Sequence, residues 1–584
     1  MHYEKLSGAL AAAAEQYHES GGAGLGAPAT LMGLVTLTEP ARPARAVVFV
    51  RGADPAALDA LRQDGIEVNA GTGPVRTGIV DFAALAAVTD NPALTQLVVS
   101  HRLRTLMDVA PGKVGVPEFV NQTELTGEGV VIGVVDTGID PQHPAFQGRV
   151  HRIWDQTARG AGVPEGQYGV ELSGERLIES RDEHGHGTHV AGIASGADSQ
   201  YPGIAPKATL VIVKTTLMDA HIADGVRYCF RVAADLGLPC VVNLSLGGHA
   251  DPHDGTDPLS AILDSESGPG KIVVCAAGNE GNDAIHARTE VSKGGTRTIG
   301  CLATGVYQVN AWYDGAAELA VQVVGPSGDA TPYQSVIGSG DPVKRYVLAD
   351  GLVQVATPGP DPVNGDHQVV VVAQPSGLGG AAPSAPSRAW RIRFRAVQAD
   401  KTRVDAWILS NPQAPAQFTG RYVDDAVKVG APGCATSAVT AAAYTTKNSW
   451  TDIDGNGQQI GLEVDDLADF SSEGPRRDDH PKPDVAAPGA MIGASLSRDA
   501  DFPRRLVLDT THVMLAGTSM ASPFVAGVVA LLLQRDPNLE PEKLRERLVA
   551  ASAVPGGEPG QFHPAWGYGL LAVDQLGADQ PGAE

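Results

Sequence analysis

Four runs of consecutive apolar residues restrict the folds open to this chain more than any other feature. The first, at residues 129–135, reads Gly-Val-Val-Ile-Gly-Val-Val and is followed directly by Asp136. An unbroken apolar run of this kind is typical of a strand buried on both faces of a parallel sheet. Strands alternating with helices predict a doubly wound α/β domain whose sites gather at the carboxyl ends of the strands. The other runs lie at 209–213, 240–244 and 271–275, with a helical segment at 222–234.

Three short segments supply the groups that acyl transfer to a serine requires. They are Val-Val-Asp136-Thr-Gly, His186-Gly-Thr-His-Val-Ala-Gly and Gly-Thr-Ser519-Met-Ala-Ser-Pro. A serine hydroxyl is a weak nucleophile until a neighbouring base removes its proton, and imidazole titrates near neutral pH. A carboxylate can hold that imidazole in the correct tautomer. We therefore predict Ser519 as nucleophile, His186 as general base and Asp136 as the orienting carboxylate.

An asparagine after a buried strand adds a fourth group. The segment Ala276-Ala-Gly278-Asn279-Glu-Gly follows the apolar run at 271–275. Asn279 can donate its side-chain amide to a tetrahedral oxyanion, together with the backbone N–H of Ser519 at a helix N-terminus. On these four segments, and on the chain order Asp, His, Ser, the sequence resembles the subtilisin-like serine peptidases. The resemblance selects His186, the first histidine of its segment, as the base.

A further segment resembles the family's substrate-binding strand. Ser245, Leu246 and Gly247 come directly after the apolar run at 240–244. The resemblance implies that an extended peptide binds there by strand addition, with Ala276 and Gly278 beside it. The apolar lining predicts tolerance of hydrophobic side chains at the cleaved bond.

The N-terminal part of the chain divides into two predicted regions. Residues 1–43 are expected to form a helix and a linker, and residues 44–108 an α+β module with a helix at 55–64. The order strand, helix, strand, strand, helix, strand is that of a ferredoxin-like layout. Its place before the catalytic domain resembles the propeptide of subtilisin-like peptidases; the alternative is an unrelated N-terminal domain. If the chain matures by cleavage, we expect the cut within residues 107–120.

The catalytic domain is predicted in two parts, 121–289 and 431–574, followed by a disordered tail at 575–584. The stretch between the aspartate and histidine segments is longer than in the short form of the family that the chain resembles, which implies an enlarged loop over residues 153–181. Segments typical of the catalytic domain return with Phe-Ser-Ser-Glu-Gly-Pro at 470–475, and helices are predicted from Met520 and from Pro541.

Between these parts, residues 290–430 have a different pattern of apolar and polar residues. Short strands alternate there with loops rich in Gly, Pro, Ser and Asp. Within one strand, Trp390, Ile392 and Phe394 share a face while the intervening arginines share the other. This pattern predicts an inserted antiparallel β-sandwich or jelly roll.

Three places in the sequence bear on metal binding. The histidines around His186 could indicate a metal site, but their spacing fits the peptidase pattern better. Ala145 stands where the resemblance implies an aspartate that often binds calcium. A calcium-like loop without the glutamate of an EF-hand is formed by Asp452, Asp454 and Asn456. The sequence requires no cofactor and leaves calcium as a candidate.

Composition excludes several classes of protein. With 43% hydrophobic and 19% charged residues the chain is typical of a soluble globular protein, and its net charge of −24 argues against nucleic-acid binding. Its five cysteines lack C-x-x-C spacing, which favours buried free thiols over disulfides or zinc. Residues 1–20 lack the pattern of a signal peptide, and no apolar stretch is predicted to span a membrane, so we expect a cytoplasmic protein, or a secreted one whose leader has been removed. Nothing in the pattern indicates the oligomeric state.

The resemblance implies a serine endopeptidase that hydrolyses proteins or peptides through an acyl-enzyme. Its activity should fall below roughly pH 6–7 as His186 becomes protonated. The alternative is a catalytically silent or self-occluded regulatory protein of the same fold, whose insert binds partners. A third hypothesis is a processing enzyme dedicated to one cytoplasmic substrate.

Overall fold

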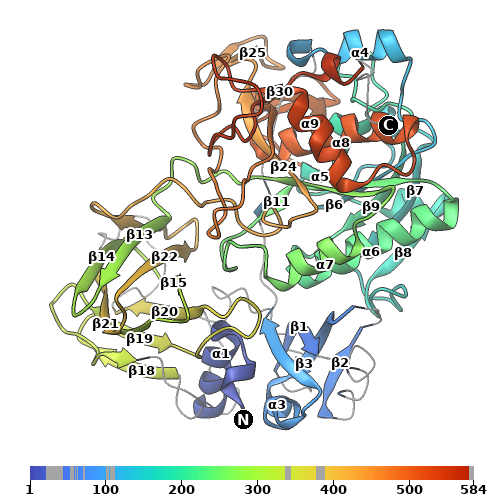
Figure 1. The fold of residues 1–584 in the computed structure, drawn as a ribbon. Coiled ribbons are helices and arrows are strands. Elements are labelled where there is room, and N and C mark those ends of the chain that lie inside the picture. Colours follow the sequence, from blue (N-terminus) through green and yellow to red (C-terminus); the bar gives the residue numbers. More distant parts are fainter. Residues whose placement is uncertain are drawn as a thin grey trace, which may run out of the picture. The chain divides into compact units, whose positions relative to one another are not determined.

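The computed structural model covers 584 residues in two compact units (Figure 1). Unit 1 comprises 1–102, 249–252 and 283–425, and unit 2 comprises 103–248, 253–282 and 426–584. The structure describes residues 1–20, 44–52, 58, 61, 64–69, 73–99, 104–105, 112–335, 343–376 and 388–577.

Unit 2 is built on a ten-stranded sheet whose central strands are all parallel. The four predicted strands lie side by side in it, which confirms the α/β expectation. In spatial order the strands are β30 (Ser552–Ala553), β31 (Leu570–Leu571), β27 (Val485–Ala490), β24 (Val439–Thr445), β12 (Lys271–Ala276), β10 (Cys240–Leu244), β6 (Val131–Asp136), β9 (Thr209–Lys214), β7 (Val150–Asp155) and β8 (Val170–Ser173).

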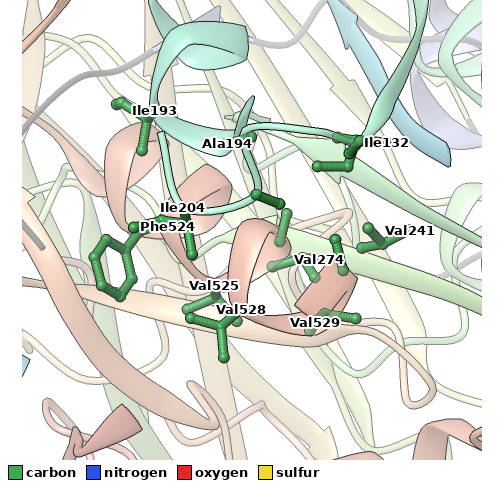
Figure 2. Close-up of a cluster of buried hydrophobic side chains, with 14 of the residues drawn as sticks. Ile132, Ile193, Ala194, Ile204, Val241, Val274, Phe524, Val525, Val528 and Val529 are labelled. Carbon is green, nitrogen blue, oxygen red and sulfur yellow. The ribbon is translucent and has the colours of Figure 1, made fainter. Parts of the chain in front are cut away.

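Helices cover both faces of this sheet. In β6, Ile132 and Val134 belong to the apolar core that α8 (Thr518–Arg535) shares with α5 (His186–Ser195), part of which is drawn in Figure 2. The alternate residue Gly133 faces α6 (Asp219–Leu236), because a Cβ there would lie 2.9 Å from the Cys229 side chain. Since successive strand residues point to opposite faces, α6 and the pair α5 and α8 lie on opposite sides of β6. The remaining helices are α4 (Val116–Thr123), α7 (Pro258–Glu266) and α9 (Pro541–Ala550).

Two expectations about unit 2 need correction. The segment 153–181 is not a simple loop: β7 and β8 form an antiparallel hairpin that extends the sheet, followed by the 3-10 helix η6 (Gly174–Glu179). Residues 575–577 lie in the 3-10 helix η8 (Val573–Gly577), while the rest of the predicted disordered tail falls outside the described residues. Within the described part, α8 alone is long and apolar enough to cross a bilayer, and 89% of it is buried.

The N-terminal module forms a four-stranded sheet in unit 1. Its order β2-β3-β1-β4 is that of the predicted ferredoxin-like layout, and all pairs in it are antiparallel. Most of the predicted helix at 55–64 falls outside the described residues. The elements are β1 (Arg45–Gly52), β2 (Ile66–Val68), β3 (Val75–Asp81), η3 (Phe82–Ala84), α3 (Leu85–Asp90) and β4 (Leu94–Val99).

The insert is an antiparallel sandwich of a six-stranded and a five-stranded sheet around one apolar core. Trp390, Ile392 and Phe394 are buried in that core, as their alternation predicts. The first sheet runs β13 (His286–Ser292), β22 (Lys401–Ser410), β15 (Tyr307–Tyr313), β20 (His367–Pro375), β19 (Gly351–Ala356) and β18 (Val343–Leu348). The second runs β17 (Gln334–Ser335), β16 (Glu318–Val324), β21 (Arg388–Gln398), β14 (Thr296–Ala303) and β23 (Ala416–Thr419).

The domain boundaries differ from those expected at two places. Strand β13 begins at His286, so the insert spans 283–425 and not 290–430. The N-terminal helix α1 (Gly8–Ser20), predicted as separate from the module, belongs to unit 1 and packs against the module and the insert. The reason is local composition: residues 9–14 present only small or apolar side chains on every face of the helix, so none faces solvent favourably.

Candidate active site

The predicted base and orienting carboxylate lie in direct contact. Asp136 is the last residue of β6, and His186 is the first residue of α5. The Nδ1 atom of His186 lies 2.5 Å from Asp136 Oδ1, and both side chains are fully buried. The carboxylate also accepts the backbone N–H of Thr137 at 2.7 Å, which fixes its plane. A carboxylate at Nδ1 favours the tautomer with its proton on that atom, so Nε2 is the nitrogen that can accept a proton.

Glycine is required beside this pair for steric reasons. Gly187 follows His186 in α5, and a Cβ on it would lie only 2.2 Å from the carbonyl oxygen of Gly138. The backbone N–H of Gly187 donates to the Thr137 hydroxyl at 2.9 Å. The helix can therefore approach the turn after β6 closely enough for the imidazole to reach Asp136.

A buried carboxylate that sequence reasoning missed ties these two segments together. Asp182 is fully buried and accepts from the Thr137 hydroxyl at 2.8 Å and from the Gly185 N–H at 2.9 Å. Its second oxygen accepts the backbone N–H and the hydroxyl of Thr188, at 2.8 and 2.6 Å. Asp182 thus satisfies N–H groups at the start of α5, where the helix dipole also favours a negative charge. An aspartate a few residues ahead of a run of small and apolar residues is a helix-capping signal, and this was the available clue.

The predicted nucleophile lies on a buried helix N-terminus. Ser519 is the second residue of α8, and its hydroxyl donates to the carbonyl oxygen of Ser245 at 2.9 Å. In return, the Ser245 hydroxyl donates to the carbonyl of Ser519 at 2.6 Å, and Asn243 Nδ2 donates to the Ser245 hydroxyl at 2.8 Å. These bonds fix Ser519 against the end of β10. Because α8 packs against α5, the nucleophile segment adjoins the helix that begins at His186.

The predicted oxyanion donor is anchored to the same helix. Asn279 Oδ1 accepts the backbone N–H of Thr518 at 2.9 Å and its hydroxyl at 3.0 Å. Anchoring the oxygen leaves the Nδ2 amide, the donor end, directed away from Thr518. Gly278, with φ +113°, makes the turn after β12, and a Cβ there would lie 2.6 Å from the Ser472 hydroxyl oxygen. The backbone N–H of Ser519 is among the first four of α8, which have no acceptor within the helix.

The predicted substrate strand is paired with another part of the same chain. Strand β11 (Leu246–Gly247) pairs antiparallel with β5 (Arg104–Thr105), in the register Leu246 with Thr105 and Gly247 with Arg104. Ser245, Leu246, Ala276 and Gly278 are buried, and Gly247 is half-buried. The edge of β11 that could receive an extended peptide therefore carries the segment that follows the N-terminal module.

The neighbouring histidines do not form a metal site. His189 is fully buried, its Nε2 lies 3.1 Å from the carbonyl oxygen of Val513, and burial lowers its pKa to about 3. His143 has Nε2 2.9 Å from the carbonyl of Thr511, and His184 is exposed. In the part of the chain that the structure describes, no group of three or more His, Cys, Asp or Glu side chains is arranged to hold a metal. All five cysteines are buried and free, and burial raises the pKa of each of the four thiols Cys229, Cys240, Cys275 and Cys301.

The calcium-like loop does not fit calcium. It joins β25 (Ser449–Thr451) to β26 (Gly457–Gln459), and the Asp452 carboxylate accepts the N–H groups of Asp454 and Asn456 at 3.0 and 2.8 Å. Gln458 Nε2 donates to the other Asp452 oxygen at 2.8 Å, and Asp454 pairs with Arg504. These oxygens are therefore engaged by N–H donors, which a bound cation would have to displace.

The second candidate calcium position holds a guanidinium group. Ala145 has no ligand side chain, and its carbonyl oxygen accepts a hydrogen bond from Arg149. Arg149 also donates to the Ser195 hydroxyl at 2.5 Å and to the carbonyl of Ala208 at 3.3 Å. Burial lowers the pKa of Arg149 to about 10. A positive charge already occupies these oxygens, so they do not fit calcium either.

Comparison with known proteins finds relatives over most of the chain. The sequence model of the subtilase family, Peptidase S8, matches residues 127–368 and 418–569. The chain is 34% identical over 207 residues to the serine protease AprX of Bacillus subtilis, covering 33% of this chain and 42% of AprX. It is 25% identical over 498 residues to the subtilisin-like protease SBT1.6 of Arabidopsis thaliana, covering 73% of this chain and 59% of the relative.

A solved structure shares the fold over most of the chain. The CspB protease of Clostridium perfringens superposes with a TM-score of 0.65 at 23% identity, covering 80% of this chain and 97% of that one. The matches to AprX and SBT1.6 span less than two thirds of those relatives' own length. The family model matches more than half of the sequence and includes all four predicted catalytic positions. This chain belongs to the subtilase family.

Proposed function

We propose that this protein is a serine endopeptidase that cleaves peptide bonds through an acyl-enzyme. The observation that carries the proposal is the buried pair of Asp136 and His186, 2.5 Å apart, in which His186 begins a helix that packs against the helix bearing Ser519. A buried imidazole oriented by a carboxylate is the arrangement that a serine nucleophile needs. Membership of the subtilase family supports the assignment of Asp136, His186 and Ser519 to these roles.

In the proposed reaction, Ser519 Oγ attacks the carbonyl carbon of the scissile bond and its proton passes to His186 Nε2. Asp136 stabilises the imidazolium that forms. The developing oxyanion accepts hydrogen bonds from the Nδ2 of Asn279 and the backbone N–H of Ser519. Collapse of the tetrahedral intermediate breaks the C–N bond, and His186 returns the proton to the leaving amine. Water, deprotonated by His186, then hydrolyses the ester and regenerates Ser519.

The pairing of β5 with β11 supports binding of an extended substrate by strand addition. Main-chain hydrogen bonds of this kind need a peptide in β conformation and do not depend on its side chains. We propose that substrates occupy the edge of β11 that Arg104 and Thr105 occupy here. The substrate class is accordingly unfolded or flexible protein segments, or peptides.

The same pairing supports self-processing as the first reaction of the enzyme. Leu106 follows Thr105 in the sequence and is hydrophobic, the type of side chain expected at the cleaved bond. We propose that the bond between Leu106 and Met107 is cut, which would make Met107, at the edge of the expected region, the new N-terminus. The full burial of Ser519 and His186 is consistent with a site that is covered before this cleavage.

The deciding experiment compares the intact masses of the purified wild type and Ser519→Ala, with N-terminal mapping of each fragment. A break after Leu106 in the wild type alone supports a working peptidase. If both proteins stay full length, labelling of Ser519 by a fluorophosphonate distinguishes an enzyme that does not process itself from a silent protein. A chain that is neither cut nor labelled would support the regulatory alternative, in which β5 occupies the substrate strand permanently.

A further inference from the structure

The outer face of the insert carries an apolar surface that a sandwich strand would not ordinarily need. In β20, Val369, Val371 and Ala373 point into the core of the sandwich. The alternate residues Val370 and Val372 point to the opposite face, where solvent-exposed polar residues are expected in a sandwich. Both are buried, at 1% and 4% exposed, and belong to a second apolar cluster that includes the N-terminal module.

Helix α1 covers this surface with one of its own faces. Gly8, Ala12 and Gln16 are spaced four residues apart and so share a face of the helix. The Gly8 N–H donates to Gln368 Oε1 at 3.0 Å, and Gln354 Nε2 donates to the carbonyl oxygen of Ala12 at 2.9 Å. Gln16 lines a small cavity with residues of β19 and β20. These contacts fix the helix on the outer face of the six-stranded sheet.

The approach is close enough to demand small residues. A Cβ on Gly8 would lie 2.8 Å from Val370 Cγ2, closer than side chains pack. All six residues from Ala9 to Ala14 are at most 3% exposed. A helix that is apolar on every face is a buried element.

The opposite side of α1 belongs to the N-terminal module. The ring of Tyr17 stacks on Phe82 with centroids 5.4 Å apart. Just before the helix, the Ser7 N–H donates to the carbonyl of Leu97 at 2.9 Å. One further bond joins module and insert without the helix, from Gln96 Nε2 to Asp361 Oδ2 at 2.8 Å. Module, helix and insert therefore share one continuous apolar cluster.

We propose that the outer face of β19 and β20 is a docking surface for α1, and that it keeps the N-terminal module bound to the insert after the chain between module and catalytic domain is cut. The insert interrupts the catalytic sequence and cannot leave it, so a docked module stays with the enzyme. Retention after self-cleavage rests on the proposed function, whereas the docking surface does not. The occupant is this chain's own first helix.

The test separates docking from catalysis by using an external protease. In the full-length Ser519→Ala protein, a tobacco etch virus protease site is inserted after His101. This position precedes β5, so the pairing of β5 with β11 cannot hold the fragment. After cutting, gel filtration under native conditions should show the N-terminal fragment eluting with the remainder of the chain. Elution of the N-terminal fragment separately from the remainder of the chain would overturn the proposal.

Substitutions on both sides of the contact identify the surface. Ala12→Glu on the helix and Val370→Glu on the insert each bury an unpaired carboxylate, and each should weaken retention by about tenfold or more. The matched control is Ala87→Glu, on an exposed position of α3 in the same module, which should retain the fragment as the parent does. Because Val370→Glu leaves the released fragment unchanged, loss of retention there cannot come from an unfolded module.

Two outcomes count against the docking surface. One is that Ala12→Glu and Val370→Glu retain the fragment as well as the control Ala87→Glu does. The other is equal loss in the control and in the variants, which would point to instability of the module. If the wild type does not cut itself, the proposed self-processing is wrong. The retention measured after cleavage at the inserted protease site does not depend on that outcome.

Discussion

The carboxylate of Asp182 and the hydroxyl of Thr137 are 2.8 Å apart, and this bond joins the segment after Asp136 to the segment before His186. Within the described residues Asp182 forms no ion pair, and its charge is balanced by hydrogen bonds and by the start of α5. The described hydrogen bonds of its carboxylate go to Thr137, Gly185 and Thr188, and not to Ser519 or the His186 imidazole. Asp182 is therefore a positioning residue for the pair of Asp136 and His186.

Asp182→Asn should lower kcat far more than it changes KM. An amide has one acceptor oxygen, so some donors among Thr137, Gly185 and Thr188 lose their partner, and small displacements of a catalytic pair reduce the rate by about 100-fold. The free energy of unfolding should fall by about 1–3 kcal/mol for a lost buried partner. Steady-state kinetics on a peptide substrate and urea unfolding measure the two effects. The control is Glu175→Gln, at an exposed position of η6. If kcat falls only in proportion to the fraction of folded protein, each folded molecule is as active as the parent. Asp182 would then have a structural role alone.

The predictable parts of this structure are those whose signal is local. The strand at β6 is apolar on both faces, and Asp136 follows it directly, so both the sheet and the place of the carboxylate could be inferred from one short segment. Asn279 after β12 was predictable for the same reason. Asp182 was not, because it lies in a charged stretch, Glu-Ser-Arg-Asp-Glu-His, that is typical of an exposed loop. Its burial depends on Thr137, Thr188 and the fold that brings them together.

The role of the N-terminal helix was also beyond local pattern. Residues 9–14 indicate a helix but not what covers it, and its partners Gln354 and Gln368 lie more than 300 residues later in the chain. The apolar run at 369–372 is a strand signal, and it lies within β20. That this strand is apolar on both faces, in a sandwich whose outer faces are usually polar, was the available clue to a further contact.

Calcium should not stabilise the protein through either of the two candidate sites. The oxygens of Asp452 and Asp454 are held by N–H groups and by Arg504, and Arg149 engages the oxygens near Ala145. Thermal unfolding of Ser519→Ala with excess EDTA and with added calcium should give Tm values within about 1 °C, since a ligand that does not bind cannot stabilise. Arg149→Met should lower the free energy of unfolding by about 1–3 kcal/mol by leaving buried acceptors unpaired, and calcium should not restore it. A rise in Tm with calcium that Asp452→Asn abolishes would contradict the interpretation of the loop, and rescue of Arg149→Met by calcium would contradict that of the oxygens near Ala145.

Asn279→Ala should lower kcat by about 100- to 1,000-fold with little change in KM, because an oxyanion donor acts only as charge develops. The anchoring of Asn279 by Thr518 means that the amide is already oriented before substrate binds. Single-turnover acylation with a peptide ester isolates the step. The control is Asn282→Ala, an exposed asparagine three residues further on. If Asn279→Ala raises KM and leaves kcat unchanged, Asn279 acts in substrate binding and not in stabilising the oxyanion.

The folded protein should lose stability in acid through its buried histidines. Burial lowers the pKa of His189 to about 3, whereas an unfolded chain has the ordinary value near 6.5. Below pH 6.5 the unfolded state takes up a proton that the folded state does not, so the stabilising contribution is complete above pH 6.5 and is lost as the pH falls toward 3. For this one group the loss reaches about 2 kcal/mol at pH 5. His221, whose pKa burial lowers to about 4, adds to the effect.

Urea unfolding of Ser519→Ala between pH 5 and pH 7.5 measures this dependence without self-digestion. His189→Gln in the same background should be less stable at pH 7.5, because the hydrogen bond to Val513 is disturbed, but its stability should depend less steeply on pH. The difference in slope should approach 1.36 kcal/mol per pH unit, the linkage limit for a single proton. His563→Gln, at an exposed histidine, should keep the parent slope. Parallel curves for the parent and His189→Gln would mean that His189 takes up its proton equally in the folded and unfolded states. A neutral imidazole at this buried position of α5 would then be excluded.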